Sequence, residues 1–143
     1  MGIAEDDGQI AHVFFEKDSP SVGDEDGEAP VLQEAFQQLN AYFQGRLKTF
    51  SLPLCLKGTV FQHKVWQATL QCPYGRTTTY KDLAVYINNP KASRAVGLAL
   101  NKNPLPIFIP CHRVLGRYGD LTGYRGGLAL KETLLQWERG KYS

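Results

Sequence analysis

The chain has 143 residues, 43% of them hydrophobic and 21% charged, a composition typical of a folded globular protein. This length allows one domain with a small appendage, and no apolar run reaches the roughly 18 residues of a transmembrane helix. The net charge of +2 is unevenly divided, because residues 1–50 hold ten acidic and three basic side chains and residues 51–143 hold four and thirteen. A basic part attracts polyanions such as nucleic acid, and solubility is the alternative explanation of its charge.

The three cysteines form no CxxC pair, which argues against a disulfide framework and against a cysteine-based zinc site. The N-terminus lacks the basic start and apolar stretch of a secretory signal. We therefore expect a cytoplasmic protein, or a nuclear one if the source is a eukaryote, with no membrane association, no metal and no cofactor.

The first part of the chain predicts one strand and one helix. Residues 9–16 are rich in β-branched and aromatic side chains, which indicates a strand. Residues 18–30 are mostly Ser, Gly, Pro and acidic residues, and predict a loop. Apolar side chains recur at helical spacing in residues 31–46. Residues 52–56 (LPLCL) predict a short buried segment.

The second part begins with Thr59 and Gln62, spaced as a capping box, which predicts a helix over 60–71. Residues 72–75 (CPYG) predict a turn. Thr79 and Asp82 repeat the capping pattern before another short helix.

Asn89 suits an N-cap and Pro90 a first helical position, so we expect a further helix over 90–101. Its expected apolar face consists of Ala92, Ala95, Val96 and Ala99. The two helices predict a helix-turn-helix over about 79–101. Gly97 weakens the second helix, which is explained either by close approach of another molecule or by helix–helix packing.

The last third predicts three elements. Residues 105–110 (LPIFIP) indicate a short apolar strand, residues 116–127 a Gly-rich loop, and residues 128–138 a helix that ends at Gly140.

Cys111 is the cysteine with a chemical context, because it follows a proline and precedes His112 and Arg113. A thiolate is the reactive form of cysteine, and neighbouring basic groups favour it. Glu138, in the last turn of its helix, faces the negative end of the helix dipole. It is either a solvated charge or the carboxylate that orients His112 in a Cys-His-Glu relay. Cys55, Cys72, His12 and His63 are interpreted as structural or solvent-facing.

The residues around Cys111 resemble the active-site segment of the O6-alkylguanine-DNA alkyltransferases, also called methylated-DNA–protein-cysteine methyltransferases. The similarity extends from about Thr59 to Gly140. Its motifs are NPLPIFIPCHRV (103–114), TTYKDLA (78–84), NPKASRAVGLALNKNP (89–104) and GYRGGLALKETLL (123–135), together with Glu138.

The resemblance implies roles for the catalytic residues. Cys111 resembles the alkyl acceptor, His112 the water-mediated general base and Glu138 the carboxylate that orients it. Asn103 resembles the residue that braces the turn holding the thiol.

The resemblance also implies contacts with the substrate. Tyr80 resembles the tyrosine that displaces a phosphate and hydrogen-bonds the flipped guanine, and Arg94 resembles the arginine inserted into the base stack. Ser93 and Gly97 are small residues that permit approach to the minor groove, and Arg113 is a further expected DNA contact. The expected guanine pocket consists of Tyr80, Val114, Tyr124 and Arg125.

The implied fold is α/β (α+β), with a shortened N-terminal α/β module in residues 1–55 and a mainly helical catalytic, DNA-binding domain in residues 56–143. Family members usually have an N-terminal module about twice that size, so the chain is expected to begin inside it. The zinc ligands that some members carry there are not apparent. Arg125 stands where some relatives have a small residue, and its side chain is expected to narrow the pocket.

The implied function is direct repair of O6-alkylguanine, and of O4-alkylthymine, in duplex DNA after base flipping, with one irreversible transfer to Cys111 per molecule. The protein is expected to act as a monomer, with cooperative binding along DNA left open. Three alternatives stay open: a non-catalytic alkyltransferase-like protein that binds lesions, a transcriptional regulator that uses the helix-turn-helix, and a thiol hydrolase.

Overall fold

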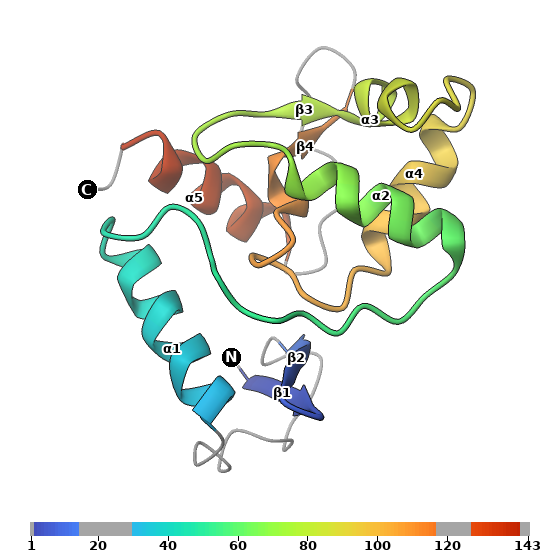
Figure 1. Ribbon diagram of the computed structural model, residues 1–143. Coiled ribbons are helices and arrows are strands. Elements are labelled where there is room, and N and C mark those ends of the chain that lie inside the picture. Colours follow the sequence, from blue (N-terminus) through green and yellow to red (C-terminus); the bar gives the residue numbers. More distant parts are fainter. Residues whose placement is uncertain (1, 15–29, 117–126, 141–143) are drawn as a thin grey trace. The chain divides into compact units, whose positions relative to one another are not determined.

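The computed structural model describes residues 2–14, 30–116 and 127–140. It divides the chain into two compact units, the first ending at Leu56 and the second beginning at Lys57. Helices and short strands make up both units (Figure 1), so the chain is a mixed α/β protein, as the sequence predicted. Among the described residues, no helix combines the length and the apolar character needed to cross a membrane.

The first unit contains a β-hairpin, in which β1 (Gly2–Asp6) pairs antiparallel with β2 (Gln9–Phe14). Asp7 and Gly8 connect the strands with φ angles of 54° and 80°. Two left-handed residues are what a tight hairpin turn requires, and Asp-Gly is a favoured pair for it. The second strand was predicted from the sequence and the first was not, although the Asp-Gly pair is typical of a hairpin turn.

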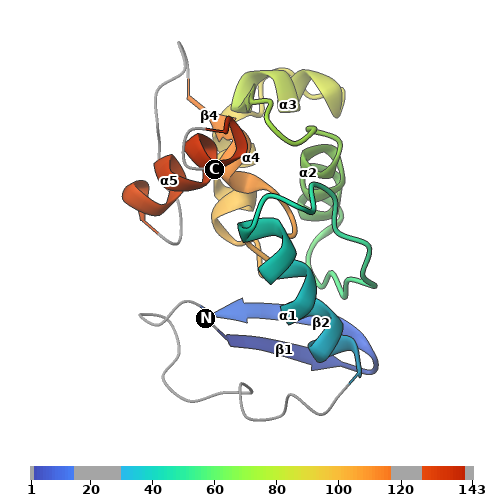
Figure 2. The same cartoon turned by 90° about the vertical axis from the view of Figure 1, so that its left-hand side faces the viewer.

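Helix α1 (Pro30–Phe43) packs against both strands of the hairpin (Figure 2). It ends three residues earlier than predicted, because Gly45 takes a φ of 77° and the Arg46 N–H closes the helix on the Ala41 carbonyl. The predicted segment 52–56 lies along β2 and is mostly half-buried. Residues 15–29, which include most of the predicted acidic loop, lie outside the described residues.

The second unit opens with α2 (Val60–Leu70). The predicted capping box is confirmed, because Thr59 Oγ1 accepts from the Gln62 N–H at 3.0 Å and Gln62 Oε1 accepts from the Thr59 N–H at 2.9 Å. Trp66 lies on the buried face of α2 and donates its indole N–H to the Ala99 carbonyl at 3.0 Å. This bond fixes α2 against the fourth helix.

Helices α3 (Tyr80–Tyr86) and α4 (Ser93–Asn101) pack together and are joined by a tight turn. The predicted N-cap at Asn89 is wrong, since α4 begins only at Ser93. Asn88 takes a φ of 62°, and the Asn89 N–H donates to the Ala84 carbonyl. This pattern closes α3, so Asn89 belongs to the end of one helix and not to the start of the next.

The buried face of α4 also differs from the prediction. Val96, Ala99 and Leu100 are buried, whereas Ala95 is exposed. Because α4 begins at Ser93, Ala92 is the N-cap residue before the helix and is half-buried.

The predicted strand at 105–110 is wrong, although the segment is buried as expected for its apolar sequence. It forms a turn in which the Ile109 N–H donates to the Leu105 carbonyl at 2.8 Å and Ile107 has a φ of 77°. Its prolines lack the N–H groups that a strand ladder needs.

Two short strands connect the remaining elements, with β3 (Thr78–Thr79) parallel to β4 (Val114–Leu115). A 3₁₀ turn, η1 (Cys111–Arg113), leads directly into β4. Helix α5 (Leu128–Glu138) packs against η1 and has the predicted bounds, with Gly140 at a φ of 80° after its end. The middle of the predicted Gly-rich loop, residues 117–126, lies outside the described residues.

Candidate active site

Cys111 is held in its turn by Asn103. The Asn103 amide Nδ2 donates to the Ile109 carbonyl at 3.1 Å and lies 3.2 Å from Cys111 Sγ, and its Oδ1 accepts from the Leu105 N–H at 2.8 Å. One buried side chain therefore fixes both ends of the turn before the thiol and directs a donor at the sulfur. A donor at this distance stabilises a thiolate relative to a thiol.

The side chains of His112 and Glu138 are in hydrogen-bond contact. This is the arrangement expected if the Glu138 carboxylate orients His112, and not if it is a solvated charge. His112 Nε2 lies 2.7 Å from Glu138 Oε2, and both side chains are almost completely buried. The other ring nitrogen, Nδ1, has no hydrogen-bond partner among the described residues. The last turn of α5 thus brings its carboxylate to one edge of the imidazole and leaves the other edge available.

The protonation states of this pair follow from burial and hydrogen bonding. Burial lowers the pKa of His112, and the hydrogen bond to Glu138 offsets only part of that effect. Burial would raise the pKa of Glu138, but hydrogen bonds from His112 and Arg113 outweigh it and hold that pKa at about 2. At neutral pH the ionised carboxylate therefore accepts a hydrogen bond from Nε2–H of a neutral imidazole. The other ring nitrogen, Nδ1, then carries a lone pair and can act as a base.

Arg113 occupies a different place from the predicted one. Its guanidinium is buried, donates from Nε to Glu138 Oε1 at 2.8 Å and from Nη2 to Oε2 at 2.9 Å, and donates from Nη1 to the Cys72 carbonyl at 2.8 Å. The predicted contact with DNA is therefore corrected, because a side chain bound in this way does not reach an outside phosphate.

Lys131 also belongs to the site, although the sequence did not predict it there. It is completely buried, and Nζ donates to the Val114 carbonyl at 2.6 Å. Burial lowers its pKa, and the charge of Cys111 acts in the opposite direction, which places the ammonium within electrostatic range of the sulfur. The spacing of Lys131, Leu134, Leu135 and Glu138 puts all four on one helix face, so a lysine on that buried face was the signal to follow.

The predicted substrate residues are only partly described. Val114 is buried in β4, whose pairing with β3 connects the Cys111 turn to the segment just before Tyr80. Tyr80 begins α3, and its ring lies beside Gly97 of α4. Tyr124 and Arg125 lie outside the described residues.

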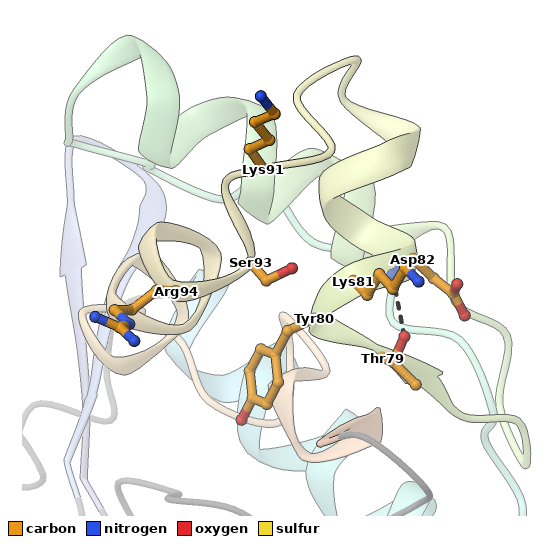
Figure 3. Close-up of a pocket in the computed structure, with 7 residues that line it drawn as sticks. All are labelled: Thr79, Tyr80, Lys81, Asp82, Lys91, Ser93 and Arg94. Atoms are coloured by element: carbon orange, nitrogen blue, oxygen red, sulfur yellow. Dashed lines mark hydrogen bonds between the residues drawn. The ribbon is translucent and has the colours of Figure 1, made fainter.

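A groove of about 1080 Å³ lies at the start of α3 and α4 (Figure 3). Ser93 and the Tyr80 ring stand near its middle, with Arg94 on one side and Lys81 on the other. The described residues that line it are Thr79, Tyr80, Lys81, Asp82, Lys91, Ser93 and Arg94. Three cations against one carboxylate make this groove suited to an anionic ligand.

Gly97 has room for a side chain. A Cβ atom at this position would have the Tyr80 ring as its nearest described neighbour, at 3.8 Å, which is an ordinary van der Waals separation. Packing within the described part of the protein does not require glycine there. Of the two sequence-based explanations, this favours close approach of an outside molecule to α4.

The remaining cysteines and histidines are consistent with the structural interpretation given to them. His12 is exposed and His63 half-buried, while burial raises the pKa of Cys72. Within the described ranges, no three His, Cys, Asp or Glu side chains converge as metal ligands.

Two family models match the chain. Residues 60–140 match the DNA binding domain of 6-O-methylguanine DNA methyltransferase, and residues 2–56 match the ribonuclease-like domain of the same family. The chain belongs to the 6-O-methylguanine DNA methyltransferase family. The resemblance drawn from the motifs around Cys111 is therefore confirmed, and with it the assignment of the chain as a DNA-repair methyltransferase.

Two known proteins are similar to this chain over almost its whole length, and a third over a little more than half of it. The constitutive methylated-DNA–protein-cysteine methyltransferase of Bacillus subtilis is 48% identical over 147 residues, covering 98% of this chain and 89% of the relative. Mycobacterium tuberculosis OGT in complex with DNA has a TM-score of 0.88 and 43% identity, covering 97% of this chain and 86% of that one. S. pombe Atl1 in complex with damaged DNA containing O6-carboxymethylguanine has a TM-score of 0.51 and 27% identity, covering 58% of this chain and 79% of that one.

Proposed function

We propose that this family member repairs duplex DNA directly, by moving the alkyl group of O6-alkylguanine to Sγ of Cys111. The observation that carries the proposal is the arrangement on η1, where a thiol braced by Asn103 is followed by a histidine bound to Glu138 at 2.7 Å. This is the order of nucleophile, base and orienting carboxylate that activates a weak nucleophile. A neutral His112 with its lone pair on Nδ1 supports the role of base.

The first step is deprotonation of the thiol. Side chains of adjacent residues in a tight turn point apart, so a water molecule carries the proton from Cys111 Sγ to His112 Nδ1. Glu138 stabilises the imidazolium that forms, because its carboxylate faces Nε2. Lys131 and the Asn103 amide favour the thiolate by placing positive charge and a donor near the sulfur.

The second step is displacement at the alkyl carbon. The thiolate attacks in line, the S–C bond forms as the C–O6 bond breaks, and the electron pair stays on the guanine oxygen. The purine takes up a proton, so the overall change exchanges the thiol hydrogen for the alkyl group. A hydrogen bond from Tyr80 stabilises the developing charge. The same chemistry applies to O4-alkylthymine, and the stable thioether limits each molecule to one transfer.

The DNA-binding part of the proposal rests on α3 and α4. The target atom is inaccessible inside a duplex, so the nucleotide is flipped out at a cost of a few kcal/mol. Arg94 fills the gap in the base stack, and the small residues Ser93 and Gly97 let α4 enter the minor groove. We place this binding and the transfer chemistry in the second unit, acting as a monomer.

A single-turnover assay tests the proposal. The protein is mixed with a duplex that carries one radiolabelled O6-methylguanine, and label bound to protein is counted against protein added. We expect one equivalent of label for the natural sequence and for Cys55→Ala, and none for Cys111→Ala, which still binds the duplex. Lesion-selective binding without transfer would instead support the alkyltransferase-like alternative, and repeated turnover of an ester would support a hydrolase.

A further inference from the structure

Arg113 and His112 converge on one carboxylate from the same turn. Glu138 Oε2 is shared by His112 Nε2 and Arg113 Nη2, at 2.7 and 2.9 Å, and Oε1 accepts from Arg113 Nε at 2.8 Å. The Gly75 N–H lies 3.3 Å from Oε1. The two parallel bonds of the guanidinium fork fix the plane of the carboxylate as well as its position.

Arg113 is itself fixed at its far side. Nη1 donates to the Cys72 carbonyl at 2.8 Å, and the guanidinium carbon lies 5.7 Å from the centre of the Tyr74 ring. The turn after α2 therefore holds the arginine, the arginine holds Glu138, and Glu138 holds the imidazole next to Cys111.

We propose that Arg113 is a positioning residue of the transfer reaction, whose forked guanidinium holds Glu138 ionised and oriented so that His112 keeps its proton on Nε2 and its lone pair on Nδ1. The inference rests on the proposed function, because it assigns how the base of that reaction is prepared. It replaces the contact with DNA that the sequence suggested for Arg113.

The charged and titratable groups around His112 and Glu138 determine how the pKa values of these two residues change when the Arg113 guanidinium is removed. His112 and Arg113 of η1 face the Glu138 carboxylate, as do Cys72 and Tyr74 from the turn after α2. Lys131 of α5 acts on His112. Without Arg113, Glu138 would lose one of the hydrogen bonds that lower its pKa, so that pKa would rise, and His112 would lose a neighbouring cation that lowers its own pKa. The pair would then take up a proton at a higher pH than in the natural sequence, and Nδ1 would carry that proton instead of a lone pair.

The test compares two substitutions across a pH series. Arg113→Met removes the charge and the fork, and Arg113→Lys keeps a charge but cannot form the fork. The rate constant of single methyl transfer is measured for each, with Arg139→Met as the control for loss of an exposed arginine beside the site. We expect Arg113→Met to slow transfer by about 10- to 100-fold near neutral pH. The acidic limb of its profile of rate constant against pH should move to higher pH, and most of the rate should be recovered in alkali.

The expected result for Arg113→Lys is an intermediate rate, because its single ammonium binds one carboxylate oxygen at a time. A rate loss of equal size at every pH would overturn the proposal, since it would indicate a purely structural role. So would a pH profile of Arg113→Met that matches the natural sequence.

Nitrogen NMR of the His112 ring gives a readout that does not depend on transfer. In the natural sequence we expect a neutral His112 ring protonated at Nε2. In Arg113→Lys we expect the ring to take up its second proton at a higher pH. This variant also provides the measurement if Arg113→Met does not fold. An unchanged His112 titration in both variants would overturn the inference. Absence of transfer by the natural sequence, with this NMR result intact, would instead count against the proposed function.

Discussion

Both the oxygen and the nitrogen of the Asn103 amide form hydrogen bonds around Cys111. Two substitutions, by aspartate and by alanine, therefore compare its effect on the thiol with its effect on the stability of the turn. Asn103→Asp keeps the acceptor for the Leu105 N–H but loses the donor to Sγ and to the Ile109 carbonyl, and it adds a negative charge beside the sulfur. We expect its Cys111 pKa to rise and the rate of alkylation by iodoacetamide at neutral pH to fall several-fold.

Asn103→Ala provides the comparison for bracing. It removes the acceptor of the Leu105 N–H and one of the two donors to the Ile109 carbonyl, which keeps the Cys111 N–H, so the free energy of unfolding should fall by about 2 kcal/mol. An unchanged pH dependence of Cys111 alkylation in Asn103→Asp would contradict a direct effect of the amide on the sulfur.

The low pKa of Glu138 makes the stability of the protein dependent on pH. Its folded value of about 2 lies below the ordinary 4.5, so the stabilisation is complete above pH 4.5 and is lost as the pH falls toward 2. The contribution is roughly 3 kcal/mol if the whole difference in pKa is counted. Urea unfolding should show that the natural sequence exceeds Glu138→Gln in stability by a margin that shrinks over this range. A margin that is constant with pH would show that the carboxylate is not held in its ionised form.

At the scale of residues, the sequence singled out the candidates for the chemistry but not the side chains that surround them. Cys111, His112 and Glu138 stood out because of their types and positions, and the contact between the last two was one of two open interpretations. The sequence predicted Arg113 as a DNA contact, whereas the structure shows its guanidinium buried. Only the fold shows that Cys72 and Glu138, distant in sequence, take up its donors.

Among the elements, α4 carries the clearest test of the DNA-binding role. Gly97→Ala introduces a methyl group that the described structure accommodates, at 3.8 Å from the Tyr80 ring. Alanine should therefore stabilise the helix by about 0.5–1 kcal/mol. The same methyl group should weaken binding to duplex DNA, measured by fluorescence anisotropy, because it separates α4 from the groove. Unchanged affinity together with higher stability would exclude close approach at this residue.

The elements that were predicted correctly are those with local signals. Helix α2 carries its capping box within four residues, and α5 combines apolar periodicity with Gly140 at its end. The errors fall where distant bonds decide the backbone. The turn at 105–110 depends on the Asn103 side chain, and the start of α4 depends on how α3 ends at Asn88.

For the molecule as a whole, the division of charge predicts strong dependence of DNA binding on salt. Each phosphate contact contributes about 0.9 to the slope of log affinity against log salt concentration. Lys81 and Lys91 line the groove at α3 and α4, so substituting either by alanine should lower that slope by about 1. Lys48→Ala, in the first unit, is the matched control and should leave the slope unchanged. Equal slopes for all three variants would place the DNA elsewhere on the protein.

The identity of the acceptor atom is the central claim, and locating the transferred group by mass spectrometry tests it most directly. The protein is reacted with a duplex containing O6-methylguanine whose methyl group is deuterated, then digested and mapped. We predict that the deuterated methyl group is found on Cys111 alone and that the peptides containing Cys55 and Cys72 are unchanged. Label on another residue, or a repaired duplex with an unmodified Cys111, would contradict the account.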